Sequence, residues 1–351
     1  MIHDLKHLLR TSCWRSACAA MLVVLSGVSY AQDRVYVRQG TTAQGTITEL
    51  TPAKVTIDVR GKEQTYQLKE VRKITFDKEP IQLDRARDLA IEGKYQQALE
   101  ELRGIQRGSL EGRVQQDFDF YQWYCEGSQS LLGSGDQMAA IKGLVSIDKA
   151  NPNGHHRFEV KELLGRLALA IANYDTAKKF FESLDQSPDA QQKASSIYYT
   201  GLVLFMQGQT AEAKAKLKSL LSATATSPEM GRLKLFAAVL DLRCENEMGN
   251  SQAALDELNA MADREDNTDL PLFAKINNAR GDCYQKLNQP QRAAYSYLQT
   301  DLLFFTDPES HAEALYHLKK LLVTVGEPAK AAQAGERLSK QYASSPWKNK
   351  K

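Results

Sequence analysis

The sequence predicts a mostly α-helical protein, in which an α-α superhelix of about seven helical hairpins follows a small five-stranded β-barrel. Three observations predict this architecture. Between residues 35 and 77, apolar and polar residues alternate with the period of two that is typical of half-buried strands. Past residue 80, the apolar residues recur at helical spacing instead. Within the helical part a similar alanine returns every 36 to 42 residues, as it does in helical solenoids.

The first 31 residues have the three parts of a secretory signal peptide. Basic residues at positions 6, 10 and 15 precede an apolar run at 17–28, and small residues at 29 and 31 mark a cut before Gln32. The apolar run is shorter than the about 20 residues of a membrane-spanning helix, although an uncleaved anchor is the alternative. We therefore expect an exported protein of the periplasm, the cell envelope or the medium, attached to a membrane only through an uncleaved signal.

The exported chain carries no net charge. Removing residues 1–31 takes away three basic residues and one acidic residue, which leaves 42 of each sign. A chain without a basic excess has no electrostatic attraction for a polyanion. We therefore expect no nucleic acid partner.

Residues 33–79 form the predicted β domain. Five short β-prone runs, "VYVRQ", "GTITEL", "AKVTIDVR", "QTYQLK" and "VRKITFD", are separated by turn residues such as Gly40, Pro52 and Gly61. Five strands in so few residues fit a small antiparallel barrel better than a sandwich, which takes about 100 residues. A core of this size is marginally stable alone, so the domain is expected to pack on the helices that follow.

The strand–glycine–strand rhythm and the final "V-x-x-I-x-F" strand resemble small SH3-like or Sm-like barrels. That resemblance implies a binding or docking module. Tyr36, Tyr66 and Phe76 could contact a ligand of such a module. Core or cross-strand packing is the usual role of strand aromatics, and it is the role that we predict.

The helical repeat is visible at four equivalent positions. The anchor alanines are Ala98, Ala140, Ala177, Ala213, Ala254, Ala293 and Ala331. Five residues before them, where a left-handed helix end favours glycine, stand Gly93, Gly135, Ala172, Gly208, Gly249, Asn288 and Gly326. Twelve residues before them, mostly small, stand Ala86, Ser128, Gly165, Gly201, Leu242, Gly281 and Lys319. Four residues after them, mostly large and apolar, stand Leu102, Leu144, Phe181, Leu217, Leu258, Tyr297 and Gly335.

This pattern resembles the tetratricopeptide repeat (TPR), with Leu-Gly in a first helix, Ala and a large residue in a second, and Pro at the exit. The stretch "LLGRLALAIANYDTAKKFF" carries it most completely. The resemblance covers residues 80–346, and residues 347–351 are left as a basic tail. The units exceed the usual 34 residues, the fifth and seventh lack the small residue, and the seventh has Gly335 where a large residue belongs.

The resemblance implies a right-handed superhelix whose first helices line a concave groove. The family's groove-lining positions fall at the centre on Tyr198, Leu202 and Phe205, and around it on Arg166, Arg243, Asn246, Asn278 and Asp282, with Glu162, Gln129, Gln285, Tyr316 and Lys320 further along. An apolar centre flanked by arginines suits a peptide with an apolar anchor and acidic groups. Alternatively, Tyr198, Leu202 and Phe205 pack against a neighbouring element.

No catalytic motif or cofactor fingerprint stands out, so we expect neither catalysis nor a cofactor. His155 and His156 lie in a predicted loop between repeats with no Cys or acidic cluster nearby in the sequence, and a solvated loop is the favoured interpretation. His311 and His317 are six residues apart and would point to different faces of one helix. We therefore expect no metal.

Cys244 and Cys283 occupy equivalent places in adjacent repeats. Packed helix axes are about 8–10 Å apart, whereas a disulfide needs Cα atoms within about 7 Å. The spacing predicts two buried free thiols.

These observations favour a non-enzymatic protein-interaction scaffold of the periplasm or cell envelope that holds a segment of a protein or peptide partner in the groove of the solenoid. Two alternatives belong to other classes. One is a structural envelope protein that self-associates through its terminal repeats. The other is an enzyme whose site lies on the β domain or in the groove.

Overall fold

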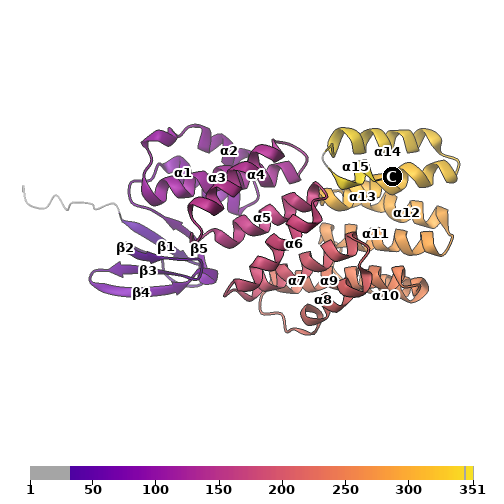
Figure 1. Cartoon of the computed structure of the whole chain (residues 1–351), viewed down its shortest axis with the longest axis horizontal. Coiled ribbons are helices and arrows are strands. Elements are labelled where there is room, and N and C mark those ends of the chain that lie inside the picture. The colour runs from indigo at the N-terminus through magenta and orange to yellow at the C-terminus, as the bar shows by residue number, and fades with distance from the viewer. Residues whose placement is uncertain (1–31, 344, 351) are drawn as a thin grey trace, which may run out of the picture.

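The computed structural model describes residues 32–343 and 345–350. The predicted signal peptide, residues 1–31, therefore lies outside the described residues. The described part begins with five strands and continues with fifteen α-helices and three short 3-10 helices (Figure 1).

The N-terminal unit is a five-stranded antiparallel sheet, as the alternating pattern predicts. Its strands are β1 (Asp33–Val37), β2 (Ala43–Leu50), β3 (Lys54–Val59), β4 (Lys62–Gln67) and β5 (Val71–Thr75). They lie in the order β4-β3-β2-β1-β5, so β1 pairs with both β2 and β5. Val35, Val55 and Ile57 are fully buried in the small core, and Phe76 packs there too. In the described residues β4 and β5 are the two edges of the sheet.

The sheet is fastened to the first helices by charged side chains. Lys73 of β5 lies 2.7 Å from a carboxylate oxygen of both Asp84 and Asp88 on the first helix. Arg113 donates a 2.8 Å hydrogen bond to the carbonyl oxygen of Ile47 in β2. The sheet therefore packs on the solenoid rather than standing alone.

The rest of the described chain forms seven helical hairpins. Their pairs are α1 (Ile81–Ile91) with α2 (Tyr95–Arg103), α3 (Gly112–Leu131) with α4 (Gln137–Ala150), α5 (Arg157–Ala170) with α6 (Tyr174–Ser183), α7 (Ala190–Met206) with α8 (Thr210–Ser222), α9 (Pro228–Glu247) with α10 (Ser251–Arg264), α11 (Leu270–Lys286) with α12 (Pro290–Leu303), and α13 (Pro308–Thr324) with α14 (Pro328–Gln341). The helical-repeat fold is thus confirmed.

The predicted turn position marks every hairpin. All seven residues at this position, the five glycines together with Ala172 and Asn288, have a positive φ between 53° and 98°. Ala172 and Asn288 adopt the same left-handed conformation as the glycines, because the position of the turn in the repeat requires it. The seven anchor alanines are all buried as well.

The small and large positions of one unit meet in space. A Cβ added to Gly165 would lie 2.5 Å from the Phe181 ring, and one added to Gly281 would lie 2.5 Å from the Tyr297 ring. In the seventh unit the two sizes are exchanged, since the aliphatic stem of Lys319 packs over Gly335. The departure from the repeat pattern is therefore compensated within the same hairpin.

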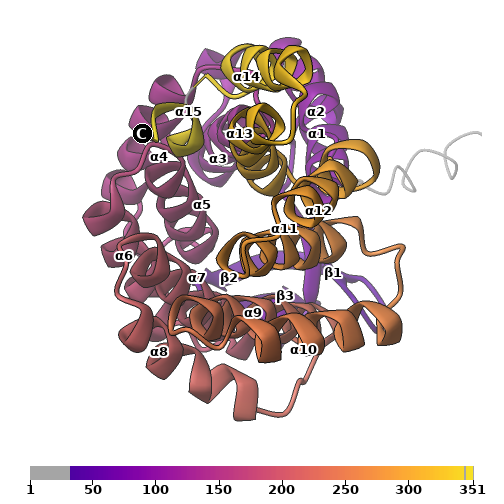
Figure 2. The ribbon, with the colours of Figure 1, turned by 90° about the vertical axis from the view of Figure 1, so that its right-hand side faces the viewer.

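The hairpins are arranged around a central axis, with first helices such as α7, α9, α11 and α13 on the inside and second helices outside (Figure 2). Contacts between successive first helices form the inner row, as between α7 and α9 or α9 and α11. The chain comes nearly full circle. The turn at Gly133 lies so close to the seventh hairpin that an added Cβ would be 2.7 Å from the Gln341 carbonyl oxygen.

The end of the chain is folded rather than trailing. Residues 347–349, which were expected to belong to a basic tail, lie in the short helix α15 (Pro346–Asn349). Trp347 is buried in the core of the seventh hairpin, in contact with the ring of Tyr316. The lysines that follow Trp347 hid this single apolar anchor in the sequence.

Cys125, Cys244 and Cys283 are buried free thiols, which confirms the prediction for the latter two. Among the described residues, none of the helices has the length and apolar character that crossing a bilayer requires.

Candidate partner-binding site on the inner face

A charged network crosses the inner face between the fifth and seventh hairpins. Arg243 of α9 forms ion pairs with Asp282 of α11, at 2.8 Å, and with Glu313 of α13. The Asn278 side-chain amide donates to Glu313 at 2.9 Å and to the Ser310 carbonyl at 2.8 Å. The structure thus brings three predicted groove residues, Arg243, Asn278 and Asp282, into one cluster.

The network extends to the second helix of the sixth hairpin. The Tyr297 hydroxyl donates to Asp282 at 2.6 Å and accepts from Gln285 at 2.7 Å. The ring of His317 stacks on Tyr297 with a centroid distance of 4.6 Å. These contacts fix the side chains of the cluster in one arrangement.

Burial and ion pairing oppose each other in the protonation of this cluster. Burial disfavours the charge of Arg243, but Asp282 and Glu313 outweigh burial and raise the pKa of Arg243 well above its usual value. Burial likewise acts to raise the pKa of Glu313, but Arg243 outweighs it, and the pKa is lowered. Arg243 and Glu313 therefore stay ionised at neutral pH.

Asn246 lies on the same face of α9 as Arg243, three residues further along the helix. Its side chain is 1% exposed, and neither its amide nitrogen nor its oxygen has a hydrogen-bond partner within the described residues. A buried amide without partners costs about 1–3 kcal/mol. The Asn246 side chain therefore has a hydrogen-bond donor and an acceptor next to the charged network that no described residue uses.

The predicted apolar centre of the groove belongs to the core. Tyr198 is 4% exposed and Leu202 is 6% exposed, and both pack within the cluster of the third to fifth hairpins. Phe205 is half-buried, and the Arg243 guanidinium lies over its ring, 5.0 Å from the ring centroid. Tyr198 and Leu202 therefore pack against neighbouring helices, which is the alternative given above, and do not line an open groove.

Arg166, another predicted groove residue, is exposed. Glu162 of the same helix and the phenol rings of Tyr199, Tyr124 and Tyr95 are the electrostatic neighbours that act on it. It lies apart from the Arg243 cluster, at the level of the third hairpin.

Lys275 and Glu313 lie on the inner face but were not predicted as groove residues from the sequence. Lys275 lies 2.9 Å from Asp307, and Tyr198 and Glu309 also act on its ammonium group. Lys275 and Glu313 stand three residues N-terminal to the groove positions used for the projection, at Asn278 and Tyr316. Extending the projection by one turn toward each helix start would have found both.

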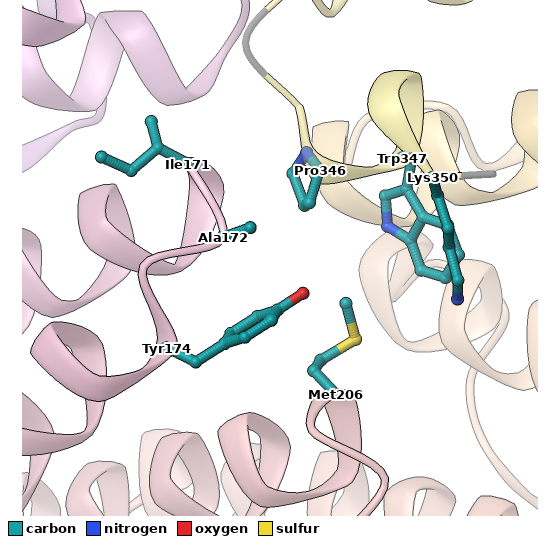
Figure 3. A pocket seen from close by; sticks show the side chains of 7 residues that line it. All are labelled: Ile171, Ala172, Tyr174, Met206, Pro346, Trp347 and Lys350. Carbon is teal, nitrogen blue, oxygen red and sulfur yellow. The ribbon is translucent and has the colours of Figure 1, made fainter.

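A cavity of about 250 Å³ opens where the C-terminal helix meets the middle of the superhelix (Figure 3). One side is formed by the α5–α6 turn and the end of α7, and the other by α15. The lining residues are Ile171, Ala172, Tyr174, Met206, Pro346, Trp347 and Lys350.

Two polar groups face each other across this cavity (Figure 3). The Tyr174 hydroxyl points into it from one side, and the indole nitrogen of Trp347 is turned toward it from the other. Trp347 is 4% exposed, yet its indole N–H has no hydrogen-bond partner in the described residues. The Lys350 ammonium lies 4.2 Å from the Trp347 ring and adds a positive charge. An apolar group that carries a hydrogen-bond acceptor fits this lining.

A second cluster contradicts the expectation of a solvated histidine loop. His155 and His156 lie between α4 and α5, as expected, but their side chains are 11% and 17% exposed. Both Nε2 atoms approach Asp117 Oδ1. Burial lowers the pKa of His156 to about 4, and the neighbouring His155 adds to that effect. The acidic partner comes from α3, which is why the local sequence did not reveal it.

The chain matches no protein-family model and no curated protein. Among solved structures it is similar to a tetratricopeptide repeat protein from Parabacteroides merdae, with 15% identity and a TM-score of 0.50 over 74% of this chain and 92% of that one. It is also similar to a Rap protein complexed with Competence and Sporulation Factor, with 14% identity and a TM-score of 0.55 over 77% of each chain. These similarities confirm the TPR-like fold.

Proposed function

We propose that this protein is a non-enzymatic interaction scaffold that holds a segment of a partner protein at the C-terminal end of its inner face. The observation that carries the proposal is the cavity between Tyr174 and Trp347, because it is open and its wall holds a buried indole N–H without a partner among the described residues. A buried donor without a partner favours a ligand that supplies an acceptor.

The lining defines the partner segment. Ile171 and Met206 offer an apolar wall for one large apolar side chain of the partner. The Trp347 N–H and the Tyr174 hydroxyl suit a carbonyl or carboxylate beside that anchor, and the Lys350 ammonium favours an acidic group. The expected segment is therefore short and acidic, with one apolar anchor.

The fold supports this proposal by its architecture. A TPR-like superhelix presents an extended inner face made from many short elements. The similar Rap protein was solved in complex with Competence and Sporulation Factor. In this chain Tyr198 and Leu202 fill the middle of the inner face, so the partner segment is placed at the cavity rather than over them.

Export completes the proposal. The N-terminal pattern supports a location in the periplasm or cell envelope, and the proposed role of the N-terminal sheet, as an SH3-like or Sm-like unit, is that of a docking module there. Protease protection in intact cells, with loss of protection after the outer membrane is opened, tests this location. A protein that stays protected after that step contradicts it.

The test of the partner site is photo-crosslinking in cells. A benzophenone amino acid replaces Ile171, which lines the cavity and is 38% exposed, and in a matched control replaces Tyr295, which is 65% exposed on α12. A specific crosslinked partner at position 171 and none at position 295 is the expected result. The same products at both positions, or none at either, would remove the cavity from the proposal.

One observation favours a second function, self-association. Leu302, Leu303 and Phe305 at the end of α12 are 64%, 59% and 53% exposed and form an apolar surface outside the site. Such surfaces are typical of protein interfaces. Sedimentation velocity at several concentrations separates the two functions, since a scaffold of the first kind remains a monomer and a self-associating protein does not.

A further inference from the structure

Asp117, His155 and His156 converge at the junction of the sheet and the solenoid. Asp117 comes from α3 and the two histidines from the α4–α5 loop. The Nε2 atom of His155 lies 3.1 Å from Asp117 Oδ1, and that of His156 lies 3.3 Å from the same oxygen. One ligand atom from each of the three residues lies within 4.8 Å of the others.

The two histidine–carboxylate separations are close to those of ligands around a tetrahedral metal ion. Zn²⁺ binds histidine nitrogen and carboxylate oxygen at about 2.0–2.2 Å. Two ligands at that bond length in a tetrahedron are about 3.3–3.5 Å apart. By contrast, a charge-assisted hydrogen bond between a histidine and a carboxylate is shorter, about 2.7–2.9 Å. The His156–Asp117 separation of 3.3 Å therefore falls in the range of a ligand set, and the His155–Asp117 separation of 3.1 Å lies between the two ranges.

The surrounding side chains hold both imidazoles in place. The ring of Phe120 stacks on His156 with a centroid distance of 3.5 Å and an interplanar angle of 5°. Phe76, from the end of the sheet, meets His155 edge-on at 6.4 Å. The Glu159 carboxylate lies 4.0 Å from the other ring nitrogen of His156, Nδ1. That distance is too long for a hydrogen bond, but the carboxylate lies on the side of the ring where metal-binding histidines typically have a carboxylate partner.

The second oxygen of Asp117 is already engaged. Arg87 donates to Asp117 Oδ2 at 3.0 Å and makes two 2.9 Å hydrogen bonds to Glu79. Asp117 would therefore bind a metal through Oδ1 alone. Glu79 offsets the charge of Arg87, so the negative charge of Asp117 remains for a cation.

There is room for a fourth ligand beside the histidines. A cavity of about 20 Å³ is lined by both histidines together with Gln116 and Phe120 of α3 and residues where α4 and α5 join. A cavity needs about 10–15 Å³ to hold one water molecule. Three protein ligands and one water complete a tetrahedral zinc site.

We propose that Asp117, His155 and His156 bind one divalent transition-metal ion of the zinc type, with water as the fourth ligand. The ion joins α3 to the α4–α5 loop, next to the linker that carries Glu79 between sheet and solenoid. Its role is to stabilise this junction, because binding to the folded state alone raises the free energy of unfolding.

The test uses the untagged full chain after removal of metals with a chelator. Calorimetric titration with Zn²⁺ is expected to show one site per chain, and Zn²⁺ is expected to raise the melting temperature. Co²⁺ in the same site is expected to give a visible absorption band. His155→Ala and His156→Ala should each weaken binding at least tenfold, and His317→Ala, which changes a histidine outside the cluster, should leave it unchanged.

Two results would overturn the proposal: no stoichiometric Zn²⁺ binding by the wild-type chain, or binding of the same strength in the His155→Ala/His156→Ala double variant. Circular dichroism checks that the variants are folded. Should His156→Ala unfold, because its ring is stacked on Phe120, the His155→Ala and Asp117→Asn variants decide the question.

Discussion

Arg243 and Glu313 are 70 residues apart in the sequence and form an ion pair across the inner face, from the fifth hairpin to the seventh. The pair spans the sixth hairpin, whose Asp282 also binds Arg243. An ion pair that skips a repeat requires a tightly wound superhelix. The inner face is therefore partly filled by its own side chains, and the accessible recess lies at the C-terminal end.

Arg243 and Glu313 are expected to be energetically coupled. Removing one partner of a buried ion pair costs about 3–5 kcal/mol, because the other charge is left unpaired. Arg243→Met and Glu313→Gln should each destabilise by roughly that amount, and the double variant by about 1–3 kcal/mol less than their sum. Urea denaturation followed by circular dichroism measures the cycle. Strictly additive effects would contradict a direct pair.

The last two repeats are expected to lose stability in acid through Asp301. Burial acts to raise the pKa of Asp301, but hydrogen bonds from His311, at 2.7 Å, and Arg337 outweigh it and lower the pKa. A lowered pKa contributes stability that is fully present above the unfolded value of about 3.9 and lost as the pH falls through the folded value.

Asp301→Asn should therefore be less stable than the wild type at pH 7. Between about pH 5 and pH 3 its free energy of unfolding should fall by less than that of the wild type. Urea midpoints at a series of pH values measure the difference. Parallel curves for the two proteins would show that Asp301 does not carry this dependence.

Close packing at Gly165 is expected to exclude even a methyl group. A Cβ there would lie 2.5 Å from the Phe181 ring, and overpacking of this kind costs about 1–3 kcal/mol. Gly165→Ala should lower the melting temperature, and Phe181→Leu in the same chain should recover part of the loss. Gly108→Ala is the control, because nothing lies within 4 Å of the added atom. Equal effects at the two glycines would refute the packing account.

Trp347 is expected to hold the seventh hairpin in place. Truncating a buried tryptophan costs about 3–5 kcal/mol. Trp347→Ala should therefore reduce the hydrogen-exchange protection of α13 and α14, while Lys348→Ala, at an exposed neighbour, should not. Unchanged protection in Trp347→Ala would mean that α15 is not needed by the last repeat.

The repeat could be predicted because its signals are local. Each hairpin carries its own turn and its own small and large residues, and Ala172 and Asn288 keep the left-handed turn without glycine. In the seventh hairpin the large residue, Lys319, stands at the usual small position, and the small residue, Gly335, at the usual large position. The two still pack against each other within the hairpin.

The site could be predicted only in part, since its geometry depends on how tightly the repeats wind. A projection onto one helix tells which side Tyr198 faces but not whether a neighbouring helix covers it. The cluster of Asp117 with His155 and His156 joins residues about 40 positions apart. Trp347 lies among lysines, and its burial depends on a surface built by the preceding hairpin.

The affinity for the crosslinked partner segment tests the central claim most directly. It is measured by calorimetry for the wild type, for Ile171→Asp and Lys350→Glu in the cavity, and for Ile81→Asp and Lys348→Glu at exposed positions outside it. Both cavity variants are expected to weaken binding at least tenfold, while both controls are expected to bind like the wild type. Wild-type affinity in the cavity variants, with the controls unchanged, would contradict it.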